Sequence, residues 1–234
     1  MTPQHTHDAR PMSCRTLRRR LVATLACAPL WALAQAQPPL VSAAERGDVV
    51  ELNRLLGAGA EVNARDARGR NAVLAATQGG HEAAARLLIE RGADVNAQDE
   101  IADSTFLLAG ARGQTGIVRA ALKAQPPPDF SRLNRYGGTA LIPVCHYGHV
   151  ETVRLLLTTA IDVNHVNRLG WSALLEAIIL GDGGAAHTEI VRLLLAHRAD
   201  PNLADAQGVT PLAHAQQRGQ REIARLLRAA GAAR

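Results

Sequence analysis

The sequence is poor in aromatic residues and in cysteine. Its 234 residues include two Trp, two Tyr, two Phe and three Cys. Two of the cysteines, Cys14 and Cys27, fall within the first 36 residues, so Cys145 has no partner for a disulfide in the remainder. A fold built from residues 37–234 must therefore be held together by packing, and we expect the lone thiol to be buried rather than reactive.

Several motifs that carry chemistry are missing from the sequence. It contains no G-x-S-x-G nucleophile elbow, no phosphate-binding G-x-x-x-x-G-K-[ST] loop and no G-x-G-x-x-G after a strand. Cys145, His146 and His149 are metal-ligand types, but their spacing points the side chains in different directions, whereas zinc needs convergent ligands. We expect no enzyme activity, no cofactor and no metal site. A metal-dependent enzyme is the alternative, and it would need a convergent polar pocket.

Long hydrophobic runs are also absent. The longest is the 14-residue stretch 21–34, which is too short to favour a membrane-spanning helix of about 20 residues. Arg15, Arg18, Arg19 and Arg20 precede it, and small residues at positions 32, 34 and 36 follow. This order predicts a secretory signal peptide over residues 1–36, with a mature protein that begins at Gln35 or Gln37 and is not inserted in a membrane.

Other interpretations of the first 36 residues remain open. Translation could start at Met1 or at Met12. Arg18 and Arg19 could form a twin-arginine signal, and Cys27 could indicate a lipoprotein. The alanine-rich composition, with arginine favoured over lysine, is typical of a bacterial protein, so we expect a periplasmic location, with secretion to the outside as the alternative.

The positive net charge of +5 depends largely on this first segment. Five of the 26 Lys and Arg residues and one of the 21 Asp and Glu residues lie within residues 1–36, which leaves +1 for the remainder. Nucleic-acid binding calls for a concentrated basic face. We therefore expect no nucleic-acid partner.

What the sequence does contain is a repeat. Displacing the chain against itself by about 33 residues places Gly47 on Gly80 and Gly59 on Gly92. Each copy has two short apolar runs at helical spacing, separated by a glycine turn and followed by a polar loop. Later copies run over residues 148–164 and 187–202, with weaker ones from Gly113 and Gly219. A fixed period of this length is typical of a stacked solenoid.

The opening motif of the repeats suggests a family. Residues 210–212 read Thr-Pro-Leu and are followed by Ala215, while 172–174 and 139–141 are looser versions. With the period, this pattern resembles the ankyrin repeat family over residues 38–230. The resemblance implies an all-α, ankyrin-type solenoid of about six helix–turn–helix–loop repeats, occupying residues 37–234. It also implies a non-catalytic scaffold that binds a protein partner, and we expect the protein to be a monomer. A secreted effector that binds host proteins is the alternative function.

The repeat also predicts which residues serve the scaffold. Glycines such as Gly59 and Gly92 are expected in left-handed conformation at helix ends. In the resembled family, the histidine after the glycine turn bonds the backbone, which applies here to His81, His149 and His187. Insertions are expected at residues 181–185 and around Pro126–Pro128. The predicted scaffold asparagines are Asn63, Asn96, Asn164 and Asn202, and the predicted core between second helices is Leu55, Leu56, Leu88, Ile89, Leu156, Leu157, Leu194, Leu195, Leu226 and Leu227.

The candidate binding surface follows from the resemblance, because ankyrin-type arrays hold partners on loop tips and on the exposed face of each first helix. We expect Arg70, Gln78, Gln98, Glu100 and Asp103 on this concave surface. We further expect Tyr136, Tyr147 and Trp171 to form one aromatic patch, with Trp171 as an energetic hot spot, since aromatics and arginine are enriched there. The predicted partner-binding residues are Arg65, Arg68, Arg112, Arg135, Tyr136, His146, Tyr147, Arg168 and Trp171.

Overall fold

The computed structural model describes residues 37–233, and the predicted signal segment lies outside them. These residues form twelve α-helices and no strand. The helices are α2 (Pro39–Glu45), α3 (Val49–Gly57), α4 (Ala72–Gly79), α5 (Glu82–Glu90), α6 (Thr105–Ala111), α7 (Thr115–Ala121), α8 (Leu141–His146), α9 (Val150–Leu156), α10 (Ala173–Ile179), α11 (Ala185–Ala196), α12 (Pro211–Gln217) and α13 (Arg221–Ala229).

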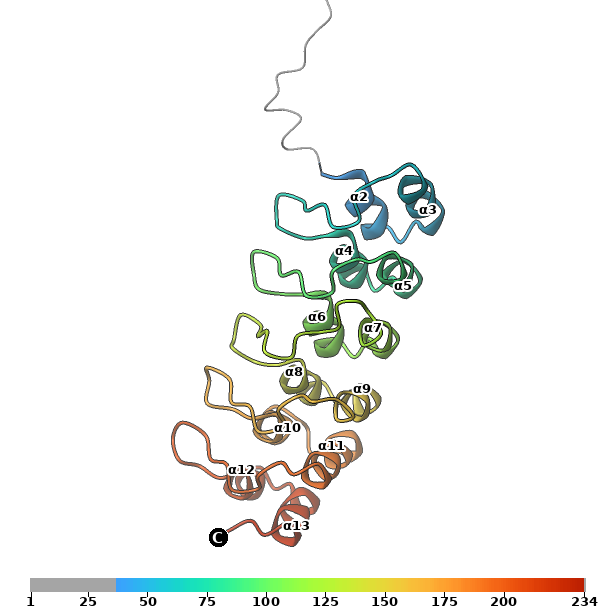
Figure 1. Cartoon of the computed structure of the whole chain (residues 1–234). Helices are drawn as coiled ribbons and strands as arrows, with labels where there is room; N and C mark the ends of the chain where they lie inside the picture. Colours follow the sequence, from blue (N-terminus) through green and yellow to red (C-terminus); the bar gives the residue numbers. More distant parts are fainter. Residues whose placement is uncertain (1–36, 234) are drawn as a thin grey trace, which may run out of the picture. The chain divides into compact units, whose positions relative to one another are not determined.

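The helices pair into six units that stack in chain order (Figure 1). The first helices, α2, α4, α6, α8, α10 and α12, line up in one column, and the second helices line up beside them. The loops that join one unit to the next project from the side of the first helices. The prediction of an all-α solenoid is therefore confirmed, with the expected six helix–turn–helix–loop units.

Short polar side chains begin the first helices. Asn71 and Ser104 precede α4 and α6, and each side-chain oxygen accepts a hydrogen bond from the backbone N–H three residues later, at 3.1 and 3.3 Å. Ser172 and Thr210 do the same for α10 and α12. Such caps satisfy N–H groups that the helix leaves unpaired. Glycines with left-handed backbone end the second helices of the first, second and sixth units, since Gly59, Gly92 and Gly231 have φ of +84°, +85° and +89°. Arg198 takes this conformation in the fifth unit, and the third and fourth units have no such residue.

The core lies between units. Of the predicted core residues, six are buried, and Leu156 and Leu194 are fully inaccessible. Leu55, Leu56, Leu195 and Leu226 are partly buried and pack against the same cluster. Cys145 is buried in α8, and burial raises the pKa of its thiol well above the usual value, with the Glu176 carboxyl adding to the effect. The predicted burial of this thiol is confirmed.

Asparagine side chains link the loops to the following unit, except in the third loop, where Ser131 stands at this position. The Oδ1 atom of Asn63 accepts a hydrogen bond from the Asp94 N–H at 2.8 Å. Asn96, Asn164 and Asn202 accept equivalent bonds from backbone N–H groups 31 to 36 residues later. The prediction that these residues belong to the scaffold is confirmed.

The predicted bond from a turn histidine to the backbone is present in two of three cases. His81 Nε2 lies 3.1 Å from the Glu45 carbonyl oxygen, and His187 Nε2 lies 2.8 Å from that of His146. The prediction is wrong for His149, which makes no such bond in residues 37–233. The predicted insertion in the fifth unit is present: α10 ends at Ile179 and α11 begins at Ala185, so His187 lies inside α11. Asp182 in this insertion accepts a hydrogen bond from the Gly184 N–H and lies 2.7 Å from the His187 ring.

Candidate functional site

The loops between units share one local structure, which fixes the residue at each tip. In the third loop, Asn134 Oδ1 accepts hydrogen bonds from the backbone N–H groups of Tyr136 and Gly138, at 2.9 and 3.0 Å. This is an Asx-type turn, which leaves the residue two positions after the Asn at the tip. The same pair of bonds is made by Asp66, Asp99, Asn167 and Asp205.

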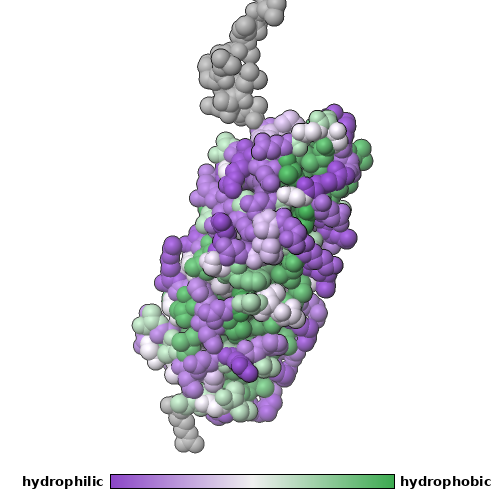
Figure 2. Space-filling view, viewed as in Figure 1, coloured by the Kyte–Doolittle hydropathy of each residue, from purple (hydrophilic) through white to green (hydrophobic). Residues whose placement is uncertain are grey.

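The three central loops carry exposed apolar side chains at this tip position. Ile101 is 43 % exposed, Tyr136 53 % and Leu169 52 %. The outer loops have Arg68 and Gln207 at the same position. Hydrophilic residues cover most of the surface in Figure 2, with hydrophobic patches among them. Because the turn is held by the Asn or Asp side chain and by backbone N–H groups, nothing in the scaffold requires an apolar side chain at its tip. We call Ile101, Tyr136 and Leu169 the tip row.

Three predicted partner-binding residues, Arg135, Tyr136 and Arg168, contact one another at the loop tips. The Arg135 guanidinium lies 5.2 Å from the centre of the Tyr136 ring, a cation–π distance, and its Nη1 lies 3.5 Å from Asp103 Oδ2. Arg168 Nη1 donates a hydrogen bond to the Arg135 carbonyl at 3.2 Å, and its backbone N–H donates to the Tyr136 carbonyl at 2.9 Å. The third and fourth loops are thereby held side by side at their tips.

Other predicted arginines are tied to the backbone of neighbouring units. Arg65 Nη1 donates to the Gln98 carbonyl at 2.9 Å, and Arg112 Nη1 donates to the Gln78 carbonyl at 2.7 Å. Both side chains retain access to solvent. Each guanidinium therefore presents its positive charge from a position that a hydrogen bond fixes.

Arg70 corrects the prediction of an exposed residue, because it is only 4 % exposed. Its guanidinium lies 2.7 Å from Asp66, 3.1 Å from Glu45 and 2.8 Å from the Gln78 side chain. Burial raises the pKa of the Asp66 carboxyl, but hydrogen bonds to Arg70 outweigh this effect and lower it. The buried charge is thus fully paired and joins the first two units.

A hollow of about 360 Å³ lies between the third and fourth units. Leu108 and Ala111 from α6 provide its apolar lining, and Arg112, Tyr147 and His149 provide polar groups. Tyr147 is 62 % exposed, and its ring stacks on His146 with centroids 4.3 Å apart. Burial, with the neighbouring His187, lowers the pKa of His146 and favours the neutral ring. The hollow can accept an apolar side chain.

The expected single aromatic patch is wrong. Tyr136 lies on a loop tip, whereas Tyr147 follows the last residue of α8. Trp171 is half-buried where the fourth loop closes onto Asn167. No ring–ring contact joins the three within the described residues. The six-residue helix α8 separates the first two, so the structure offers a tip row and a hollow in place of one cluster.

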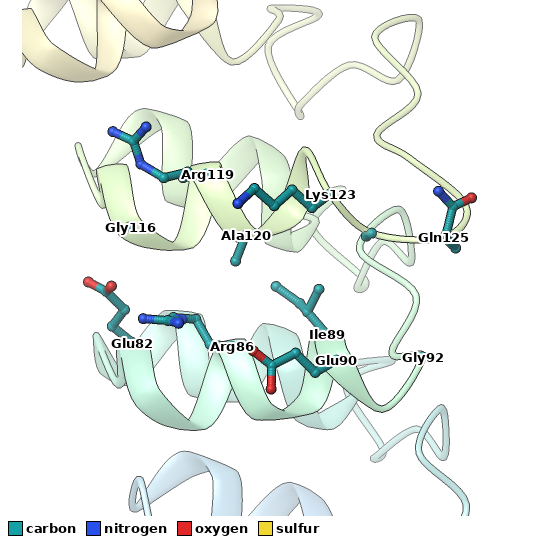
Figure 3. Close-up of a pocket in the computed structure, with 11 residues that line it drawn as sticks. Glu82, Arg86, Ile89, Glu90, Gly92, Gly116, Arg119, Ala120, Lys123 and Gln125 are labelled. Atoms are coloured by element: carbon teal, nitrogen blue, oxygen red, sulfur yellow. The ribbon is translucent and has the colours of Figure 1, made fainter.

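A second hollow, of about 590 Å³, lies between the second helices α5 and α7 (Figure 3). Gly116 and Ala120 leave room for it, where the other repeats mostly have larger residues. Figure 3 shows Ile89 and Ala120 directed between the helices, with Glu82, Arg86, Glu90 and Lys123 around them. Its charges are mixed, and it lies in the column of helices away from the loops.

The stacked helix pairs, asparagine-linked loops and glycine turns define a helical repeat protein. A family model of ankyrin repeats matches residues 20–99, 106–205 and 182–233. The chain belongs to the ankyrin repeat family. In residues 37–233, no group of three His, Cys, Asp or Glu side chains could hold a metal ion, and no helix is long and apolar enough to cross a membrane.

Known relatives agree with this assignment. The ankyrin repeat protein YahD of Escherichia coli (strain K12) is 42 % identical over 191 residues, covering 81 % of this chain and 94 % of YahD. The crystal structure of an ankyrin repeat domain from Acinetobacter baumannii AYE superposes with a TM-score of 0.80 at 51 % identity, covering 83 % of this chain and 98 % of that one. The ankyrin repeat domain of Bcl-3, a member of the IkappaB protein family, superposes with a TM-score of 0.74 at 27 % identity. The match covers 85 % of this chain and 88 % of that one.

The structure adds residues that the sequence did not single out. Ile101 and Leu169 belong to the tip row, and Leu108 and Ala111 line the hollow. The tip residues could have been found from the sequence, because each lies two positions after the Asp or Asn of a loop. The hollow could not, since it depends on how two units pack.

Proposed function

We propose that this protein binds another protein across its inner surface, which we define as the loop tips together with the first helices. The observation that carries this proposal is the tip row. Three successive loops expose an apolar side chain at a position where the fold does not require one. Ankyrin repeat domains typically mediate protein–protein interactions. The protein acts without catalysis in this account.

The inner surface has the composition of an interaction site. Exposed apolar side chains that lie together usually mark a contact surface. Aromatic and arginine side chains, here Tyr136, Tyr147, Arg135 and Arg168, are the residues most often found at energetic hot spots. An apolar side chain of the partner that enters the hollow beside Tyr147 is removed from water. The predicted roles of Arg65, Arg68, Arg112, His146 and Trp171 in binding also belong to this proposal.

Affinity capture tests the proposal. Purified protein is used to capture partners from a cell extract, beside a triple variant, Ile101→Ser/Tyr136→Ser/Leu169→Ser. Val50→Ser is the matched control, because Val50 on α3 is 82 % exposed but lies on a second helix. We expect a protein that the wild type and the control capture and the triple variant does not. A partner retained equally by all three would contradict the proposal.

We further propose that the protein is exported to the periplasm and acts there. The arginine-rich start, the apolar stretch 21–34 and the small residues at 32, 34 and 36 support this proposal. N-terminal sequencing of the protein from a periplasmic fraction should begin at Gln35 or Gln37. Recovery of residues 1–30 in the purified protein would contradict export by a cleaved signal peptide.

A further inference from the structure

Glu176 on α10 is a charged residue in an unusual environment. The residue is only 8 % exposed, and its Oε2 atom is buried without a hydrogen-bond partner among residues 37–233. No Lys, Arg or His nitrogen of the described residues lies within ion-pairing distance of it. A carboxylate removed from water without a partner is unfavourable, so a natural sequence retains one only where something else is gained.

Two other acidic side chains that are removed from solvent are paired. Asp66 is bound by Arg70, and Asp205 Oδ2 lies 2.7 Å from His214 Nε2. His214 occupies the same register position in the next unit, and its ring is engaged with Asp205. Among residues 37–233, Glu176 is the one acidic residue with a buried side-chain oxygen that has no hydrogen-bond partner.

The scaffold does not ask for an acid at this position. Glu176 is the fourth residue after the cap Ser172, and Leu108 is the fourth after the cap Ser104. Leu108 lines the hollow between the third and fourth units, so this register position borders the inner surface. The corresponding residues of the other units are Ser42, Ala75, Pro143 and His214. Small, apolar and polar residues all occur at this position in the other units, so the fold does not require a carboxyl group there.

We propose that Glu176 is the point on the inner surface that recognises a lysine or arginine side chain of the protein partner. A cation placed there would supply the charge-assisted hydrogen bonds that the buried oxygen lacks. Leu180, one helical turn later, is 40 % exposed and can pack against the aliphatic stem of the same side chain. This inference rests on the proposed function, and it adds the chemistry of one contact to it.

A peptide selection tests the inference, because the selected peptides themselves serve as the binding partners. Random linear peptides are displayed and selected on the purified wild-type protein, and dissociation constants of the selected peptides are measured. We expect them to share a Lys or Arg. Replacing it with Ala should weaken binding to the wild type at least tenfold, and should change binding to Glu176→Gln, which keeps the shape and removes the charge, by less than about twofold. Glu222→Gln, on the second helix α13, is the matched control and should behave as the wild type.

The outcomes separate the two claims. Peptides that bind the wild type and Glu176→Gln equally, yet lose affinity when the tip row is replaced with serine, would overturn the inference and leave the proposed function intact. Peptides that depend on neither Glu176 nor the tip row would overturn both. A cation requirement that persists unchanged in Glu176→Gln would place the acidic contact elsewhere and overturn the inference.

Discussion

Leu156→Ala is expected to lower the free energy of unfolding by about 2–5 kcal/mol, the usual cost of truncating a buried leucine. Leu156 is fully inaccessible between stacked second helices, so its loss removes apolar burial and leaves a cavity that both neighbours line. Leu194 has the same environment one unit later, and Leu194→Ala should lose a similar amount. Because each unit is stable only against its neighbours, the effect should spread beyond one helix pair.

Chemical denaturation followed by circular dichroism measures this change. Val50→Ala is the control, since Val50 is 82 % exposed, and it should alter the free energy of unfolding by less than about 0.5 kcal/mol. A loss below about 0.5 kcal/mol for Leu156→Ala would mean that the register of the second helices is wrong.

Glu176→Gln is expected to become more stable relative to the wild type as the pH rises. Burial raises the pKa of Glu176 from 4.5 to about 7. A carboxyl whose pKa is higher in the folded state costs nothing while it is protonated in both states. The cost grows as the pH rises from about 4.5 to about 7, and is constant above that. The full difference corresponds to about 3 kcal/mol.

The measurement is the difference in unfolding free energy between Glu176→Gln and the wild type, at about pH 4.5 and about pH 8. This difference should increase by up to about 3 kcal/mol in favour of the variant, because glutamine does not ionise. Glu222→Gln should show no such increase, since the hydrogen bond from Arg225 lowers the pKa of Glu222. An unchanged difference for Glu176→Gln would mean that its carboxyl is hydrated or paired.

The helices, their pairing and much of the core could be predicted from the sequence, because they depend on spacing within one repeat. Leu156, Leu194 and the scaffold asparagines recur at fixed intervals, and recurrence marks what every unit needs. The loop tips were harder to interpret, since they differ from unit to unit. Aromatic content points to Tyr136 and Trp171, and it gives no weight to the aliphatic tip residues Ile101 and Leu169.

The pairing of individual charged side chains across two units could not be predicted. Arg70 lies in a polar loop, where the sequence predicts an exposed side chain. In the structure it is buried and forms ion pairs with Glu45 of the first unit and with Asp66 of its own loop. Glu176 is the opposite case: it lies on an apolar helix face, and the neighbouring cation that would pair it is absent from the described residues. Neither outcome follows from the sequence of a single repeat, because both depend on how side chains of neighbouring units meet.

The measurement that tests the central claim most directly is the dissociation constant of the captured partner, determined by calorimetry for three forms of the protein. If the tip row forms the binding surface, Ile101→Ser/Tyr136→Ser/Leu169→Ser should weaken binding at least about thirty-fold, or about 2 kcal/mol. Its melting temperature should change little, and Val50→Ser should bind as the wild type does. Equal dissociation constants for all three forms would contradict the account and place the partner on another face.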